Sequence, residues 1–212
     1  MRHPSDIVAC EQTSQLYVAD FNQGVWRVSA DGADIKRWWT QSSTDSFSPN
    51  SLSVTSTRLL VTSFSASQLI QLDTLGNELR RVQLPDDMEP WHAVESPTTT
   101  FIASLYNTQL KDSQISEVNK DGQVLRQFTS LRLSPFGFSQ HIAIDSHGNI
   151  FVADSHNDRI LLLDAQLKLR RLIIDEHQLH YKRPWHLCYR EPTGQLLVAL
   201  VDRALVFDVF RR

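Results

Sequence analysis

Three histidines occupy equivalent positions in the sequence, each near the start of a short apolar segment. They are His92, His141 and His186, and Asp6 stands at the same position of a fourth such segment. Three imidazoles and a carboxylate are a ligand set that a metal ion such as Zn²⁺ accepts. A histidine at such a position can also hydrogen-bond between neighbouring structural units, and we favour this structural role. The sequence therefore predicts no metal and no cofactor, with the three histidines as weak candidate ligands.

Two tryptophans and several loop residues are candidates for binding a partner. Trp91 and Trp185 each precede an apolar segment, and exposed aromatic side chains often anchor protein partners, although both can also pack into the core. Loops on a rigid scaffold are a common location for recognition. The further loop candidates are Tyr106, Asn107, Lys111, His156 and Asn157.

Other catalytic signatures are missing from the sequence. There is no Gly-x-Ser-x-Gly nucleophile motif and no glycine-rich phosphate loop, and glycine accounts for only 7 of 212 residues. Cys10 and Cys188 lie among apolar neighbours, where burial favours an inert thiol over a nucleophile. These absences favour a binding function over catalysis, and we predict that the chain is not an enzyme.

An internal repeat determines how these residues must be positioned. One apolar segment recurs five times at intervals of 42–49 residues, namely at 16–20, 59–63, 101–105, 150–154 and 196–200. A second apolar segment precedes each copy and a third follows it, and a fourth follows the third in the first four repeats. Turn residues such as Asp31-Gly32 and Asp121-Gly122 separate the third segment from the fourth. Short apolar segments punctuated in this way predict an all-β fold.

A repeat of this length with four strands is typical of a β-propeller blade, which must stack on its neighbours to bury both faces. The sequence predicts one propeller domain over residues 1–212. Its five blades span approximately 4–42, 48–86, 89–133, 138–177 and 183–212. The fourth segments carry lysine and arginine, which suit an exposed edge strand. The equivalent histidines should then converge near the central channel.

The segment 141–160 closely resembles the NHL repeat. It contains Asp145, Gly148, the run Val152-Ala-Asp154 and the run Asn157-Asp-Arg-Ile160 in the order of that pattern. Weaker matches lie at 4–28 and 184–208. The resemblance implies an NHL-type propeller similar to the C-terminal part of TRIM-NHL proteins, which are ubiquitin ligases. The predicted function is thus a non-catalytic scaffold that binds a protein through one loop face. The 212 residues contain no RING module that could supply ligase activity.

Two alternatives remain open beside the scaffold. One is an RNA-binding NHL propeller, which the formal net charge of −3 disfavours. The other is a metal-dependent propeller lyase or hydrolase that uses channel histidines, since a related propeller lyase has such histidines. In that lyase the ligand directly follows the proline, whereas Trp91, Trp185, Gln140 and Ser5 stand there in this chain.

The composition and the chain ends suggest further expectations. Hydrophobic residues make up 41% and charged residues 21%, as in soluble globular proteins. The sequence shows no long apolar run, no secretory signal and only two cysteines, so we expect a cytoplasmic protein without membrane contact. The fifth repeat ends after its third strand. We therefore expect a fragment of a six-bladed propeller, with an irregularly closed five-bladed ring as the alternative.

Overall fold

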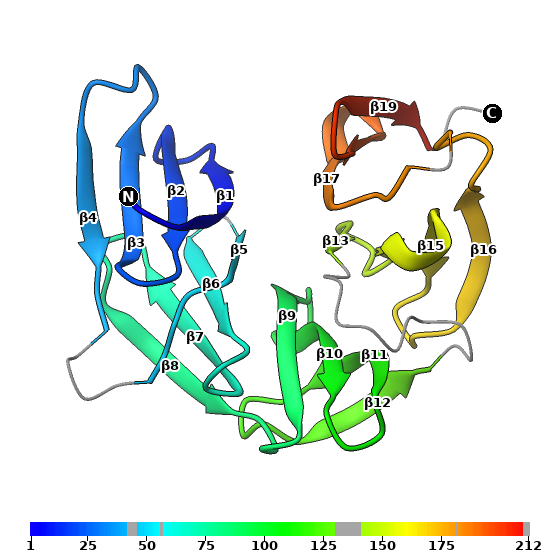
Figure 1. Ribbon diagram of the computed structural model, residues 1–212, viewed down its shortest axis with the longest axis horizontal. Coiled ribbons are helices and arrows are strands. Elements are labelled where there is room, and N and C mark those ends of the chain that lie inside the picture. The colour runs from blue at the N-terminus through cyan, green and yellow to red at the C-terminus, as the bar shows by residue number, and fades with distance from the viewer. Residues whose placement is uncertain (42–45, 56, 130–140, 181, 210–212) are drawn as a thin grey trace.

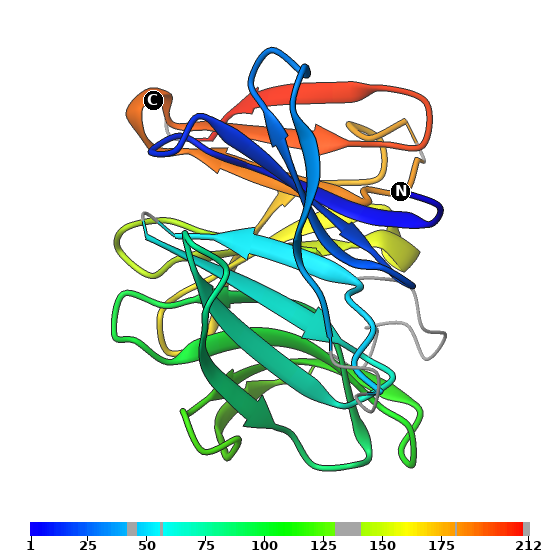
Figure 2. The same ribbon diagram turned by 90° about the vertical axis from the view of Figure 1, so that its left-hand side faces the viewer.

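The computed structural model describes residues 1–41, 46–55, 57–129, 141–180 and 182–209. Five antiparallel sheets surround a common centre, and each is built from one continuous stretch of chain (Figure 1). The side view shows the sheets stacked face to face around that centre (Figure 2). This arrangement confirms the predicted all-β propeller with five blades.

The strands of each blade follow one another in space in the order of the chain. Blade 1 consists of β1 (Pro4–Cys10), β2 (Gln15–Asp20), β3 (Gly24–Ser29) and β4 (Ile35–Trp39). Blade 2 consists of β5 (Ser51–Val54), β6 (Arg58–Ser63), β7 (Gln68–Asp73) and β8 (Glu78–Gln83). Blade 3 consists of β9 (Met88–Glu95), β10 (Phe101–Asn107), β11 (Asp112–Val118) and β12 (Val124–Phe128).

Blade 4 consists of β13 (Ile142–Ile144), β14 (Ile150–Asp154), β15 (Arg159–Leu163) and β16 (Leu169–Ile174). Blade 5 consists of β17 (His186–Arg190), β18 (Gln195–Ala199) and β19 (Ala204–Asp208). Two single turns of 3₁₀ helix, η1 (Ser155–Asn157) and η2 (Glu191–Thr193), lie within connections. In the described part of the chain, no helix is both long and apolar enough to cross a membrane.

Burial along each blade follows from its position in the stack. Every residue of β14, the second strand of blade 4, is buried, because this strand lies between two neighbouring blades. All five residues of β12, the fourth strand of blade 3, are exposed or partly exposed. The basic residues of the fourth strands therefore lie at the outer edge of the ring, as the sequence predicts. Arg126 there pairs with Glu117 of β11, with Nε 2.7 Å from the carboxylate.

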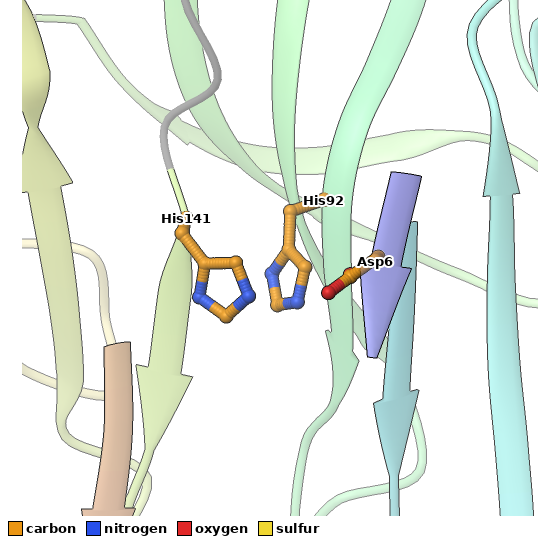
Figure 3. Close-up of side chains that lie close together, drawn as sticks. All are labelled: Asp6, His92 and His141. Atoms are coloured by element: carbon orange, nitrogen blue, oxygen red, sulfur yellow. The ribbon is translucent and has the colours of Figure 1, made fainter. Parts of the chain in front are cut away.

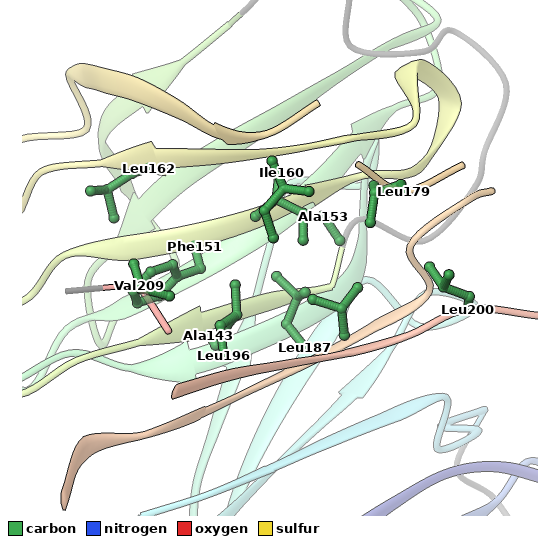
Figure 4. Close-up of a cluster of buried hydrophobic side chains, with 12 residues drawn as sticks. Ala143, Phe151, Ala153, Ile160, Leu162, Leu179, Leu187, Leu196, Leu200 and Val209 are labelled. Carbon is green, nitrogen blue, oxygen red and sulfur yellow. The ribbon is translucent and has the colours of Figure 1, made fainter. Parts of the chain in front are cut away.

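Four hydrophobic clusters join successive blades. Blades 4 and 5, for example, share a cluster in which Phe151 and Ile160 of blade 4 meet Leu187 and Leu196 of blade 5 (Figure 4). Equivalent clusters join blade 1 to 2, blade 2 to 3 and blade 3 to 4. Among the described residues no such cluster joins blade 5 to blade 1. These two blades instead meet through polar side chains at the centre of the ring, Asp6 of β1 and His186 of β17.

Blade 5 has three strands in the described part of the chain. This agrees with the predicted lack of an outer strand in the last blade. The exposed side of this blade carries Cys188, a residue that the sequence analysis placed among buried neighbours. Cys188 is exposed because alternate residues of β17 face blade 4, and Leu187 takes the buried position there. Cys10 is buried, as predicted.

The turn at Gly122 provides a test of the packing between blades 2 and 3. Gly122 has φ +83°, and a Cβ built there would lie 1.8 Å from the carbonyl oxygen of Gln83 in β8. Gly32 occupies the same turn position in blade 1 with φ +73°, but nothing lies within 4 Å of its Cβ. We expect Gly122→Ala to lower the free energy of unfolding by about 1–3 kcal/mol more than Gly32→Ala, because only Gly122 adds overpacking to the backbone strain. Urea unfolding of both variants measures the difference, and equal losses would show that the blades separate there easily.

Candidate functional site

The equivalent histidines converge at the centre of the ring. His92 lies in β9, His141 directly precedes β13, and His186 is the first residue of β17. Asp6 of β1 completes the group, and Figure 3 shows Asp6, His92 and His141 side by side. The first strands of successive blades are the innermost strands, so equal positions in the repeat become neighbours in space. This confirms the expectation from the sequence that these residues lie together near the central channel.

The three imidazoles form a continuous stack. Ring centroids lie 3.7 Å apart between His92 and His141, and 4.0 Å apart between His141 and His186. His92 is buried, whereas 40% of the His186 side chain is exposed. His186 therefore lies at one end of the stack, and a substantial part of its side chain is open to solvent. His92 lies at the other end and is buried.

His92 and His141 hold neighbouring blades together through the backbone. The backbone N–H of Ile142 in blade 4 donates to Nδ1 of His92 at 3.4 Å, and that of Leu187 in blade 5 donates to Nδ1 of His141 at 3.2 Å. Nε2 of His92 lies 3.3 Å from the carbonyl oxygen of Leu52 in blade 2. These contacts give the two histidines the structural role, between neighbouring blades, that the sequence analysis favoured.

Asp6 and His186 form a pair between blades 1 and 5. Nε2 of His186 lies 3.0 Å from Oδ1 of Asp6, whose side chain is only 2% exposed. The same carboxylate accepts hydrogen bonds from the backbone N–H of Ile7 at 2.7 Å and of Leu52 at 2.8 Å. No hydrogen bond to Nδ1 of His186 is present among the described residues. The carboxylate is therefore fixed on several sides, and it holds one imidazole by one nitrogen.

The environment separates the pKa values of the three histidines. Burial lowers the pKa of His92 to about 4, although the nearby Asp6 charge acts in the opposite direction. Burial, together with the charges of the two neighbouring imidazoles, lowers the pKa of His141 well below its usual 6.5. Both rings are consequently neutral at pH 7.

His186 and Asp6 shift in the directions that favour an ion pair. Burial alone would lower the pKa of His186, but the hydrogen bond and the charge of Asp6 outweigh it and raise the pKa above 6.5. Burial alone would raise the pKa of Asp6, yet the hydrogen bond and charge of His186 outweigh it and lower the pKa below 3.8. Both shifts favour a charged His186 next to an ionised Asp6.

The hydrogen bonds test whether the cluster fits a metal ion. Donor atoms of Asp6, His92 and His141 lie within 4.8 Å of one another, which is compact enough to suggest a site. Because Nδ1 of each histidine accepts a backbone N–H, each neutral ring carries its proton on Nε2. A metal needs a lone pair at the ligating nitrogen, so both rings would have to give up their contacts with the next blade. The arrangement does not fit a metal ion held by these residues.

A pocket of about 580 Å³ opens above the cluster, and its size is ordinary for a small-molecule site. The cluster residues Asp6, His92, His141 and His186 contribute to its lining. The pocket also brings together four large aromatic side chains, Phe21, Phe64, Trp91 and Trp185. Sequence reasoning singled out the tryptophans but not the two phenylalanines. Both follow the second strand of their blade directly, so an alignment of the repeats would have found them.

The other candidate contact residues do not line this pocket. Asn107 is buried and shapes its own loop, because Oδ1 accepts the N–H groups of Gln109 and Leu110 at 3.0 and 2.7 Å. Asn157 donates to both oxygens of Asp154 at 2.9 Å. Tyr106 and Asn107 lie in strand β10 and not in a loop as predicted, because the strand extends to Asn107. Lys111 and His156 lie in connections, and Gln140 lies outside the described residues. Their binding of a partner stays a prediction.

Comparison with known proteins shows the fold but no family. No family model matches the chain, and no curated protein sequence matches it. A solved virginiamycin B lyase from Staphylococcus aureus aligns with a TM-score of 0.63 and 13% identity, covering 99% of this chain and 71% of the lyase. A streptogramin B lyase aligns with a TM-score of 0.65 and 14% identity, covering 98% of this chain and 69% of the lyase.

A third structure is the S. aureus lyase in a catalytically inactive histidine-to-alanine variant with quinupristin. It aligns with a TM-score of 0.63 and 12% identity, covering 99% of this chain and 71% of the lyase. These comparisons confirm the propeller fold, whereas membership of the NHL family stays a prediction. The prediction that the chain is not an enzyme is withdrawn, because propellers that share this fold over nearly the whole chain are lyases. At 12–14% identity these structures show the shared fold alone.

Proposed function

We propose that the chain is a propeller enzyme of the lyase type, in which His186 acts first as general base and then as general acid while Asp6 orients it. The observation that carries the proposal is the 3.0 Å contact between Nε2 of His186 and the buried Asp6 carboxylate, below an open pocket. A carboxylate that holds one nitrogen of an imidazole fixes its tautomer and leaves the other nitrogen with a lone pair. In this pair Nδ1 of His186 is the base.

The reaction that such a base supports is an elimination. Neutral His186 accepts a proton from a carbon next to a carbonyl group, and the electron pair of that C–H bond forms a carbon–carbon double bond. The bond between the neighbouring carbon and an oxygen leaving group breaks at the same time. The imidazolium then returns its proton to the leaving oxygen, so the atoms balance without a co-reactant. Asp6 stabilises the imidazolium between the two proton transfers.

Three features support this proposal over the alternatives. The structures with the same fold include lyases, and one of them is described as inactive after the loss of a single histidine. The proton positions on His92 and His141 disfavour the metal-dependent version of the alternative. A single accessible imidazole of raised pKa meets the requirement of base catalysis.

The reaction class can be tested with two compounds. One is quinupristin, because it is present in the inactive lyase structure. The other is N-benzoyl-O-acetylserine methyl ester, a neutral compound whose elimination gives N-benzoyldehydroalanine methyl ester and acetic acid. We expect products whose masses sum to that of the substrate, measured by mass spectrometry. Products that contain one added water would show hydrolysis instead, and no conversion of either compound would contradict a lyase with this specificity.

The pair also predicts how activity depends on pH. His186 acts as a base only when neutral, and its pKa lies above 6.5, so kcat/KM should rise with pH through that pKa. Asp6→Asn removes the charge that raises the pKa, and the rise should move to lower pH while the maximal rate falls. Rate profiles and NMR titration of the His186 ring measure both shifts. An unchanged pKa in Asp6→Asn would contradict the pairing.

A further inference from the structure

The aromatic residues above the cluster form an ordered surface. Phe21 of blade 1 stacks on Phe64 of blade 2, with ring centroids 5.6 Å apart and an interplanar angle of 26°. Phe64 in turn stacks on Trp91 of blade 3 at 5.2 Å and 19°. We name Phe21, Phe64 and Trp91 the aromatic shelf. Three successive blades each contribute one ring to it.

The aromatic shelf is not part of the hydrophobic core. Its three side chains are partly exposed, and none of them belongs to the clusters that join blades. Asn50 fixes two of the segments that carry it, because Nδ2 donates to the carbonyl oxygen of Trp91 at 2.8 Å and Oδ1 accepts the N–H of Phe64 at 2.8 Å. The shelf is thus held rigidly while its rings border the pocket.

The charge of the pocket restricts what can lie on the shelf. No lysine, arginine or glutamate is among the described residues that line it. Its ionised carboxylate, Asp6, is already paired with His186. A phosphate or carboxylate ligand would find no lysine or arginine among these residues, and the charge of His186 is already matched by Asp6. Burial of an anion without such a partner is costly. A flat uncharged group loses little on desolvation and gains from stacking on the rings.

We infer that the pocket binds a neutral ligand that carries an aromatic ring, with the ring against the aromatic shelf and the reacting end toward His186. This inference rests on the proposed function for the position of the reacting end only. The recognition of the ring depends on the shelf and not on catalysis. The inference therefore assigns a substrate class to the site, namely uncharged compounds that carry an aromatic ring.

Three unreactive probes of similar shape test the inference. N-acetylphenylalanine amide is neutral and aromatic, N-acetylcyclohexylalanine amide lacks the aromatic ring, and N-acetylphenylalanine is an anion at pH 7. We expect NMR titration to give the aromatic amide an affinity about two- to tenfold higher than the cyclohexyl amide, in line with the strength of aromatic stacking. The anion should bind more weakly than either. The indole N–H signals of Trp91 and Trp185 should shift with the aromatic amide.

Variants separate the shelf from the catalytic pair. Phe64→Leu and Trp91→Leu keep an apolar side chain, and each should abolish the preference for the aromatic amide. Trp26→Leu is the matched control, because Trp26 lies on β3 and does not line the pocket. The preference for the aromatic amide over the cyclohexyl amide should persist in His186→Gln, even where turnover is lost, because His186 is not part of the aromatic shelf.

Several outcomes would overturn the inference. They are equal affinities for the two amides, tighter binding of the anion, no binding of any probe, or an aromatic preference that both shelf variants retain. If the shelf variants do not fold, the indole N–H signals of the parent protein provide the test. The inference is then overturned if the aromatic amide binds without shifting these signals. Binding without turnover would refute the proposed function alone.

Discussion

Replacing His186 with glutamine is expected to lower kcat by about 10²- to 10⁴-fold, the usual contribution of a general base. Glutamine keeps a side chain that can hydrogen-bond to Asp6, but it cannot accept a proton from the substrate near pH 7. The loss should appear in kcat and in kcat/KM alike, because His186 as a base stabilises the transition state and not the bound substrate. Conversion of N-benzoyl-O-acetylserine methyl ester, followed by mass spectrometry, measures it.

The matched control for this variant is His156→Gln. His156 is an exposed histidine in the 3₁₀ turn η1, and it does not line the pocket. The control should retain the parent rate. A thermal unfolding curve shows whether His186→Gln still folds and how much stability it loses, since the Asp6–His186 contact joins blades 1 and 5. A folded His186→Gln variant with parental turnover would remove His186 from the mechanism.

Replacing Asp154 with alanine is expected to lower the free energy of unfolding by about 3–5 kcal/mol, the cost of removing one partner of a buried ion pair. Asp154 is fully buried at the end of β14, and Nε of Arg159 lies 2.7 Å from its Oδ2. The variant leaves Arg159 partly buried without its anion, and it leaves the amide of Asn157 without its two acceptors. Urea unfolding at pH 7 measures the change.

A surface aspartate supplies the comparison for Asp154. Asp202 pairs with Lys182, but both side chains are 40% exposed or more, and exposed pairs contribute little. Asp202→Ala should therefore unfold at nearly the parental urea concentration. Equal effects of the two substitutions would show that the Asp154 cluster is not a stabilising element of blade 4.

Repetition in the sequence was sufficient to predict the blades and the meeting of the histidines. Strand period and turn residues are local properties, and they give the order of strands in each blade without knowledge of distant contacts. Equal positions in successive blades must lie around one centre, which placed Asp6, His92, His141 and His186 together. The same reasoning placed the basic fourth strands at the outer edge.

The sequence analysis preferred a scaffold to an enzyme for a physical reason. It judged the histidines as one set, although their environments differ. His92 and His141 hold neighbouring blades together, whereas His186 of the last blade contacts the Asp6 carboxylate of the first blade. The spacing of residues in the sequence does not show that the first and last blades contact each other. The Asp6–His186 pair was therefore not predicted.

The sequence by itself determined the propeller, its five blades and the residues that line its centre, because these depend on periodic burial and turn chemistry. Only the tertiary structure decided which histidine pairs with Asp6, that His92 and His141 carry their protons on Nε2, and that Phe21 and Phe64 extend Trp91 into a shelf. Tautomers, pKa shifts and ring stacking depend on distances of 3–6 Å between side chains of different blades. Those distances are fixed by the packing of blades against one another, to which residues far apart in the sequence contribute.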